Sequence, residues 1–163
     1  MNKHTKKNLG NKAHAIGRYR FITTDSVTGE VKRISDWHKN KVVNGTGTGI
    51  NIIARLLAND STYPLAITKA KIGTGTNAPA DGDTDLQTPT FTKNSVALQE
   101  VSGGSVTISF FLTTAELSNG TYTEFGIFSG TQLFARSIIT PSYVQGTNED
   151  TTVEYQIDLS NPS

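Results

Sequence analysis

The chain has no cysteine, and it has only one methionine and one tryptophan among its 163 residues. Without cysteine there can be no disulfide, no thiolate nucleophile and no cysteine-ligated zinc. Long apolar runs are also missing, so no stretch reaches the roughly 20 apolar residues that a membrane-spanning helix needs. The basic N-terminal stretch lacks the apolar centre of a secretory signal. These absences predict a protein that is made and used without export and without membrane insertion.

Apolar residues are scarce as well, at 35% of the chain, while glycine and threonine are plentiful. This mixture suits β-strands joined by polar turns, and it also suits a subunit whose core is completed by its neighbours. A chain of 163 residues can bury the core of one domain. We expect a basic arm over residues 1–16 and a single β-sandwich-like domain over residues 17–163.

Charge is distributed unevenly along the chain although the net charge is only +1. Residues 1–41 carry ten cations and three acids, a net charge of +7, and the remainder carries −6. The ten cations are Lys3, Lys6, Lys7, Lys12, Arg18, Arg20, Lys32, Arg33, Lys39 and Lys41. Such an end can attract the acidic body of an adjacent subunit or a polyanion. No pattern of arginine with stacked aromatics accompanies it, which disfavours a nucleic-acid partner.

The first ordered element predicted is a β-hairpin whose turn spans residues 25–30. Gly29 can supply a positive φ, and Asp25 can bond the backbone two residues further on. A third extended piece is expected at residues 41–43. The apolar residues from Ile50 to Leu57 then recur at helical spacing, which predicts one amphipathic helix at about 49–58, capped by Thr48.

Beyond Pro64 the sequence has the pattern of β-strands throughout. Turn residues separate segments in which apolar and polar positions alternate, which is typical of antiparallel sheets with one buried face. The fold class expected is therefore mainly β: an antiparallel β-sandwich with one short α-helix and a flexible basic N-terminal arm. The predicted strands are 66–72, 93–101, 105–112, 123–129, 133–139 and 151–159.

Two motifs invite a ligand interpretation. Gly-Thr-Gly-Thr occurs at 45–48 and at 73–76, but neither copy is followed by the Lys-Ser/Thr of a phosphate-binding loop. Asp81, Asp83 and Asp85 resemble the opening of a calcium loop, yet Leu86 stands at its sixth position and Thr92 at its twelfth. We therefore interpret the first Gly-Thr-Gly-Thr as a glycine-rich turn beside a helix. We interpret the three aspartates as a solvated acidic turn or as a docking patch for the basic arm.

Signals for catalysis are weak. The three histidines, His4, His14 and His38, do not form a ligand set, and no Gly-x-Ser-x-Gly motif is present. Paired carboxylates for sugar hydrolysis would have to come from Glu100, Glu116, Glu124, Glu149 and Glu154. Most of those residues fall at strand ends or on polar strand faces, where we expect solvated charge. The sequence predicts no enzyme, no cofactor and no metal.

Aromatic residues divide into two groups by position. Phe125, Phe128 and Phe134 are expected in the core. Tyr63, Tyr122 and Tyr143 are expected in turns, where they can line a sugar- or protein-binding surface.

The chain resembles a family of tailed-bacteriophage virion proteins, the tail, baseplate and tail-fibre-associated structural proteins. Three pieces carry the resemblance: TGEV at 28–31 with NKVVNG at 40–45 and INIIARLL at 50–57; KIGTGTNAP at 71–79 with DTDL at 83–86; and TEFGIF at 123–128 with LFAR at 133–136. The resemblance implies a β-sandwich-like subunit in a symmetric ring or trimer without enzymatic activity. It leaves tail, baseplate, collar and head-attached positions open, and the leader before Gly17 is not part of the pattern.

These observations favour a virion protein, assembled in the host cytoplasm, whose partners are copies of itself and other virion proteins. The residues expected to serve assembly are the cations Lys3, Lys6, Lys7, Lys12 and Arg18, with Asp81, Asp83 and Asp85 as acceptors. Alternatives are a receptor- or glycan-binding module displayed at the tail tip, and a head-attached decoration or fibre-anchoring protein.

Overall fold

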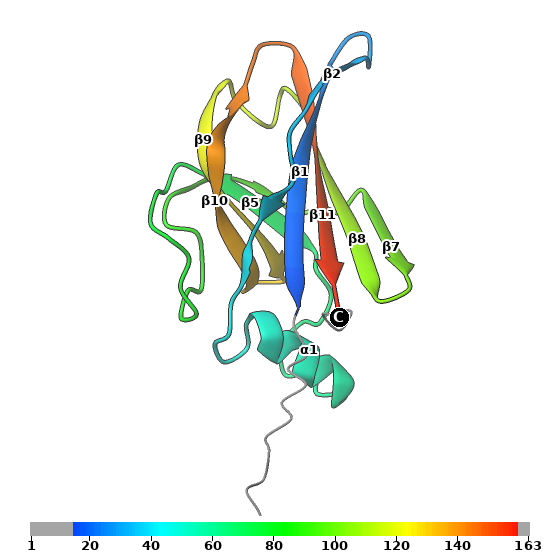
Figure 1. The fold of residues 1–163 in the computed structure, drawn as a ribbon, viewed down its shortest axis with the longest axis vertical. Helices are drawn as coiled ribbons and strands as arrows, with labels where there is room; N and C mark the ends of the chain where they lie inside the picture. The colour runs from blue at the N-terminus through cyan, green and yellow to red at the C-terminus, as the bar shows by residue number, and fades with distance from the viewer. Residues whose placement is uncertain (1–14, 160–163) are drawn as a thin grey trace, which may run out of the picture.

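Two antiparallel β-sheets pack face to face in the computed structural model, which describes residues 15–159 (Figure 1). The first sheet has the order β2-β1-β11-β8-β7, with β3 also paired to β1, and the second has the order β4-β10-β9-β5-β6. The strands are β1 Ile16–Asp25, β2 Val31–Ile34, β3 His38–Lys39, β4 Lys41–Val42, β5 Lys69–Gly73, β6 Pro89–Lys93, β7 Leu98–Ser102, β8 Ser105–Leu112, β9 Gly120–Ser129, β10 Gln132–Gln145 and β11 Glu149–Asp158. The expected β-sandwich is therefore confirmed.

Alternation of apolar and polar residues explains the core between the sheets. In β11 each inward residue, such as Val153 and Tyr155, is buried, and its neighbours in sequence are partly exposed. The same period of two places Ile108 and Phe110 of β8 inward, directly beside their β11 partners in the register. Phe125, Phe128 and Phe134 are at most 3% exposed, which confirms that they belong to the core.

The predicted hairpin is present as β1 and β2. Asp25 Oδ1 accepts the backbone N–H groups of Val27 (2.9 Å) and Thr28 (3.0 Å). Gly29 has a φ of +74°, a left-handed conformation that costs glycine little. The turn lies at the opposite end of the sandwich from the helix (Figure 1).

Helix α1 spans Gly49–Leu57, as expected, and packs below the sheets against β10 (Figure 1). The predicted capping hydrogen bond from the Thr48 side chain is absent. Thr48 occupies the N-cap position, but its hydroxyl makes no bond to the helix and instead accepts the backbone N–H of Gly45 at 2.9 Å. Gly49 touches the backbone of Val43 so closely that a Cβ would overlap it. The first Gly-Thr-Gly-Thr thus acts as the expected turn between strand and helix.

Strand boundaries differ from expectation mainly around the bends. Strand β6 was missed, and the predicted strand 93–101 shortens to β7. The placement of Tyr122 and Tyr143 in turns is wrong, because β9 and β10 extend through them and both side chains are 6% exposed. Strand β10 continues past 139 because its register with β9 shifts between Ile138 and Tyr143, an irregularity that alternation alone does not reveal.

Candidate functional site

The loop between β5 and β6, residues 74–88, is held in place by one buried carboxylate. Glu124 of β9 is fully buried. Its two oxygens accept the backbone N–H groups of Gly75 (3.0 Å), Gln87 (2.9 Å) and Thr88 (2.6 Å). Because these donors belong to both ends of the loop, a single side chain fixes where the β5–β6 loop leaves the sheet and where it returns.

Arg136 of β10 completes this arrangement. Its guanidinium donates to Glu124 Oε2 (3.3 Å), to the carbonyl of Asn77 (2.9 Å) and to Asp83 Oδ2 (2.8 Å). Only 4% of its side chain is exposed. Both terminal nitrogens of the guanidinium are bonded, whereas Nε is buried without a hydrogen-bond partner. Further hydrogen bonds help a buried ion pair to be tolerated, and here they also tie the middle of the loop to the sheet.

Glycines make room for the buried carboxylate. A Cβ on Gly75 would lie 2.6 Å from Glu124 Oε1, and a Cβ on Gly73 would lie 2.7 Å from the same oxygen. Atoms cannot approach so closely, so the second Gly-Thr-Gly-Thr is required by packing. The outer residues of the β5–β6 loop, among them Thr74, Thr76 and Asn77, remain exposed.

The three aspartates predicted as acceptors all lie in the β5–β6 loop, and each has a partner within the same chain. Asp81 pairs with Lys41 (3.3 Å), Asp83 with Arg136 (2.8 Å) and Asp85 with Lys71 (2.7 Å). Arg18 bonds Gln156 (2.7 Å) on the outer face of the first sheet. The cations Lys3, Lys6, Lys7 and Lys12 lie outside the described residues, so their pairing with these aspartates stays a prediction.

Most of the five glutamates were expected to be solvated, and two of them are buried instead. Glu124 is fully buried and Glu149 is 7% exposed. A signal for Glu124 does exist in the sequence, because it is an acid within the apolar run of a central strand. What it bonds could not be foreseen, since its donors lie 36 to 49 residues away along the chain.

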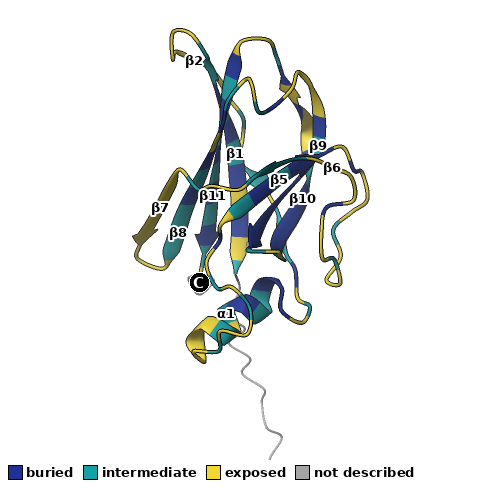
Figure 2. Ribbon diagram, turned by 180° about the vertical axis from the view of Figure 1, so that it is seen from behind, coloured by how far each residue is buried: buried dark blue, intermediate teal, exposed yellow. Residues whose placement is uncertain are grey.

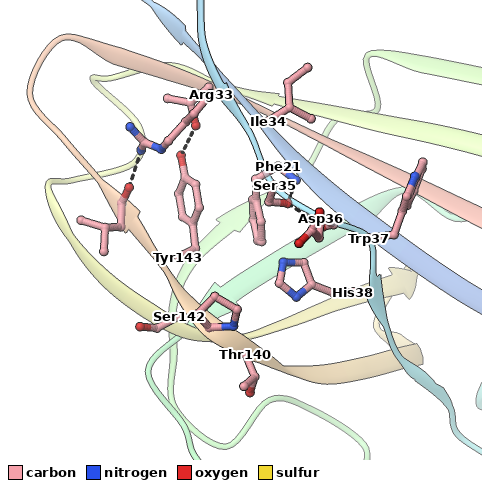
Figure 3. A pocket seen from close by; sticks show the side chains of 13 residues that line it. Phe21, Arg33, Ile34, Ser35, Asp36, Trp37, His38, Thr140, Ser142 and Tyr143 are labelled. Atoms are coloured by element: carbon pink, nitrogen blue, oxygen red, sulfur yellow. Dashed lines mark hydrogen bonds between the residues drawn. The ribbon is translucent and has the colours of Figure 1, made fainter.

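A second feature is a crevice of about 510 Å³ at the side of the sandwich (Figure 3). One wall is the segment from Arg33 to His38, which links β2 to β3, and the other is residues 140–144 of β10. Phe21 and Thr23 of β1 contribute from the core side. Its size falls within the range of small-ligand sites.

Aromatic stacking and hydrogen bonds fix the crevice. The rings of Tyr143 and Phe21 stack with centroids 4.2 Å apart. The Tyr143 hydroxyl lies 3.0 Å from that of Thr23, and Arg33 binds both oxygens of Glu149 at 2.7 and 2.8 Å. The pKa of Glu149 is lowered, first by this bond from Arg33. The walls are therefore preformed.

His38 and Trp37 contact residues on opposite faces of β1. His38 contacts inward-facing aromatic residues of this strand, and Trp37 contacts its outward-facing arginines. The His38 ring stacks on the Tyr19 ring, with their centroids 5.2 Å apart. Burial lowers the pKa of His38, against a hydrogen bond with the Thr140 backbone. Arg18 and Arg20 place their guanidinium groups 4.6 and 4.7 Å from the Trp37 ring centroid, an arginine–aromatic cluster that the sequence pattern did not reveal.

Within residues 15–159, no group of three or more acidic or histidine side chains is arranged to hold a metal ion. No helix in the same range has the length and apolarity to span a membrane. Comparison of the chain with family models, with curated proteins and with solved structures gives no match.

Proposed function

We propose that this chain is a non-enzymatic structural protein of a tailed-bacteriophage virion, and that it forms a symmetric homo-oligomer in the tail, baseplate or collar. The observation that carries the proposal is the β5–β6 loop. The buried carboxylate of Glu124 and the buried guanidinium of Arg136 bond the two ends and the middle of this loop and thereby hold it against the sheet. A preformed loop loses little entropy when a partner binds it, which favours a role in contacts between proteins.

The pieces that resemble the phage family meet at this same place. Gly75 of the second piece bonds Glu124 of the third. Lys41 of the first piece pairs with Asp81, and its strand β4 pairs with Ala135 and Arg136. Residues far apart in the sequence therefore form one structural unit, and this unit supports the resemblance as more than a set of separate short matches.

Two measurements test the proposal. Sedimentation equilibrium of the purified protein gives its mass, and antibody labelling of purified phage particles by electron microscopy gives its location. We expect a defined oligomer and label at one position along the tail. A protein that is monomeric at every concentration and missing from purified particles would reject the proposal.

The crevice favours a second candidate, a receptor- or glycan-binding module at the tail tip. It combines the indole of Trp37 with the polar side chains of Asp36 and Ser142, a mixture suited to a sugar. Of the three tyrosines first expected at such a surface, Tyr143 lines the crevice, whereas Tyr63 and Tyr122 do not. Because Trp37 is the sole tryptophan, its fluorescence reports on this site alone.

Titration with host surface polysaccharide tests this candidate. In the wild type, saturable quenching of Trp37 fluorescence would favour this candidate. The variants Ser142→Trp and Ser102→Trp carry a second tryptophan, so their binding is measured by ligand depletion. Binding that is lost in Ser142→Trp and retained in the distant Ser102→Trp would favour the crevice as the site. Absence of binding to host cells and to their polysaccharides would leave the structural role alone.

A further inference from the structure

The crevice contains one acidic side chain that has no partner of opposite charge. Asp36 is exposed and lines the crevice, and within residues 15–159 its carboxylate forms neither a hydrogen bond nor an ion pair. Ser35 Oγ donates to the backbone carbonyl of Asp36 and not to its carboxylate. Figure 3 shows Asp36 beside His38, whereas Trp37 stands apart from both. A ligand in the crevice can therefore use the Asp36 carboxylate as an acceptor.

The arginine that lines the crevice, Arg33, is already balanced by an acid. Its two terminal nitrogens donate to the two oxygens of Glu149 at 2.7 and 2.8 Å, and one of them also donates to the Val144 carbonyl. Lys32, the residue before it, pairs with Asp25 at 3.2 Å. Both cations belong to β2, which is exposed along its length (Figure 2). At this end of the crevice, positive and negative charges are matched one for one.

Two further arginines lie on the outward face of β1. Arg18 and Arg20 hold their guanidinium groups 4.6 and 4.7 Å from the centroid of the Trp37 ring, and Arg20 pairs with Glu154 at 3.1 Å. Phe21, by contrast, points inward from the same strand and lines the crevice. Neither arginine is among the lining residues, so their charges lie outside the crevice.

His38 adds no positive charge in the neutral range of pH. Its ring is half-buried and stacks on Tyr19, and burial lowers its pKa. Above about pH 6.5 the ring is therefore uncharged. Among the described residues that line the crevice, Asp36 is left as the one unmatched charge.

The rest of the lining suits a ligand that has both hydroxyl groups and apolar C–H faces. Thr140 and Ser142 are exposed hydroxyl residues of β10. Ile34 and Val144 are 56% and 55% exposed and also line the crevice. A sugar ring can bond the hydroxyl and carboxyl groups while its C–H groups pack on the aliphatic side chains. A few polar groups within an otherwise apolar lining are typical of small-ligand sites.

We infer that the crevice takes a neutral sugar, whose hydroxyl groups donate to the Asp36 carboxylate, and that it rejects acidic sugars. A hydrogen bond to an ionised acceptor is about twice as strong as one between neutral groups. The carboxylate of an acidic sugar would instead meet the unmatched charge of Asp36 and be repelled. This inference rests on the second candidate function, the glycan-binding module, and names the class of glycan.

The test uses pairs of methyl glycosides that differ at one carbon. Methyl glucoside and methyl glucuronide share their ring and its hydroxyl groups, but the exocyclic carbon is a hydroxymethyl group in one and a carboxylate in the other. The matching galactose pair extends the test to a second stereochemistry. NMR titration of the isotope-labelled full chain gives the dissociation constants and shows whether the amides of Asp36 and Ser142 shift.

In the wild type, the neutral member of a pair should bind at least about tenfold more tightly than its acidic counterpart. Asp36→Asn keeps the size of the side chain and removes its charge. It should weaken binding of the neutral glycoside about tenfold and abolish the preference. Glu100→Gln removes an exposed carboxylate of β7, outside the crevice, and should change neither value.

The outcomes separate this inference from the function on which it rests. Equal or tighter binding of the acidic glycosides, or a preference that survives in Asp36→Asn, overturns the inference. Failure of every glycoside to bind also overturns it, and the glycan-binding module stands only where the host polysaccharide still binds. Failure of the glycosides and the polysaccharide overturns both. A neutral preference that is lost in Asp36→Asn, with circular dichroism unchanged, and kept in Glu100→Gln supports the inference.

Discussion

Glu124 and Arg136 meet inside the protein, with Oε2 and Nη2 3.3 Å apart and at most 4% of either side chain exposed. The two residues stand on neighbouring strands, where Arg136 is paired with Gly126, two residues beyond Glu124. Each of the two charged groups also forms hydrogen bonds with the backbone of the β5–β6 loop. The pair therefore links the middle of the second sheet to the part of the surface that we assign to assembly.

Replacing Glu124 by Gln should destabilise the protein strongly. The substitution leaves the Arg136 guanidinium buried with only the partly exposed Asp83 as counter-charge, and removal of one partner of a buried pair costs about 3–5 kcal/mol. Urea unfolding gives the free energy of unfolding. Glu100→Gln is the control, because Glu100 is exposed and its replacement should change that value by no more than about 0.5 kcal/mol.

A double-mutant cycle separates the pair from the loop bonds. Arg136→Met combined with Glu124→Gln should cost less than the two single changes added together, because the double variant leaves no unpaired buried charge. Strictly additive losses would show that the two side chains act independently.

Gly75→Ala should also reduce stability. A Cβ at this position would lie 2.6 Å from the Glu124 carboxyl group, and relief of such overpacking costs about 1–3 kcal/mol. Gly82 lies in the same loop with nothing within 4 Å of an added Cβ, so Gly82→Ala is the matched control and should be neutral or slightly stabilising. Thermal or urea unfolding of the two variants side by side decides the matter. Equal stability would mean that the β5–β6 loop moves aside without cost.

Sequence reasoning succeeded where the cause is local. The alternation in β8 and β11, the Asp25 turn and the helix at 49–57 all depend on residues close together in the chain, and all three are present. It failed at Glu124, because whether a carboxylate is solvated depends on segments brought to it by the fold. The donors from Gly75 and Thr88 become neighbours only once β5 and β6 flank the loop.

The crevice was beyond prediction for a related reason. One of its walls is residues 140–144 of β10, and these lie at the register shift between Ile138 and Tyr143, which alternation along the strand does not reveal. Alternation identifies Val101 as an inward residue but cannot show that nothing within the described chain lies over it.

His38 should make stability depend on pH. Burial lowers its pKa from about 6.5, so the unfolded chain takes up a proton at a higher pH than the folded protein does. Its contribution is complete above about pH 6.5 and is lost as the pH falls through the window below that value. Asp36 opposes the shift and burial dominates it.

Unfolding of the wild type and of His38→Gln in urea at a series of pH values measures this contribution. The difference in stability between the two should shrink as the pH falls below about 6.5. An NMR titration of the His38 ring gives the folded pKa directly, and a value at or above that of a free histidine would contradict the expectation.

The phenols of Tyr19 and Tyr155 should resist ionisation until the protein unfolds. Both side chains are fully buried, and burial raises the pKa of each well above its usual value of 10. The Tyr19 hydroxyl donates to Ser137 Oγ at 2.9 Å, while that of Tyr155 accepts from the Asn40 amide. Stability from these groups is complete below about pH 10 and is lost as the pH rises above that value, because only the unfolded chain releases the protons there.

An alkaline titration followed by phenolate absorbance should show fewer than the five tyrosines ionising while circular dichroism is native, with the rest ionising together with unfolding. Tyr19→Phe should remove one tyrosine from the late step. If all five ionised reversibly in the folded protein, the two hydroxyls would have to be accessible to solvent.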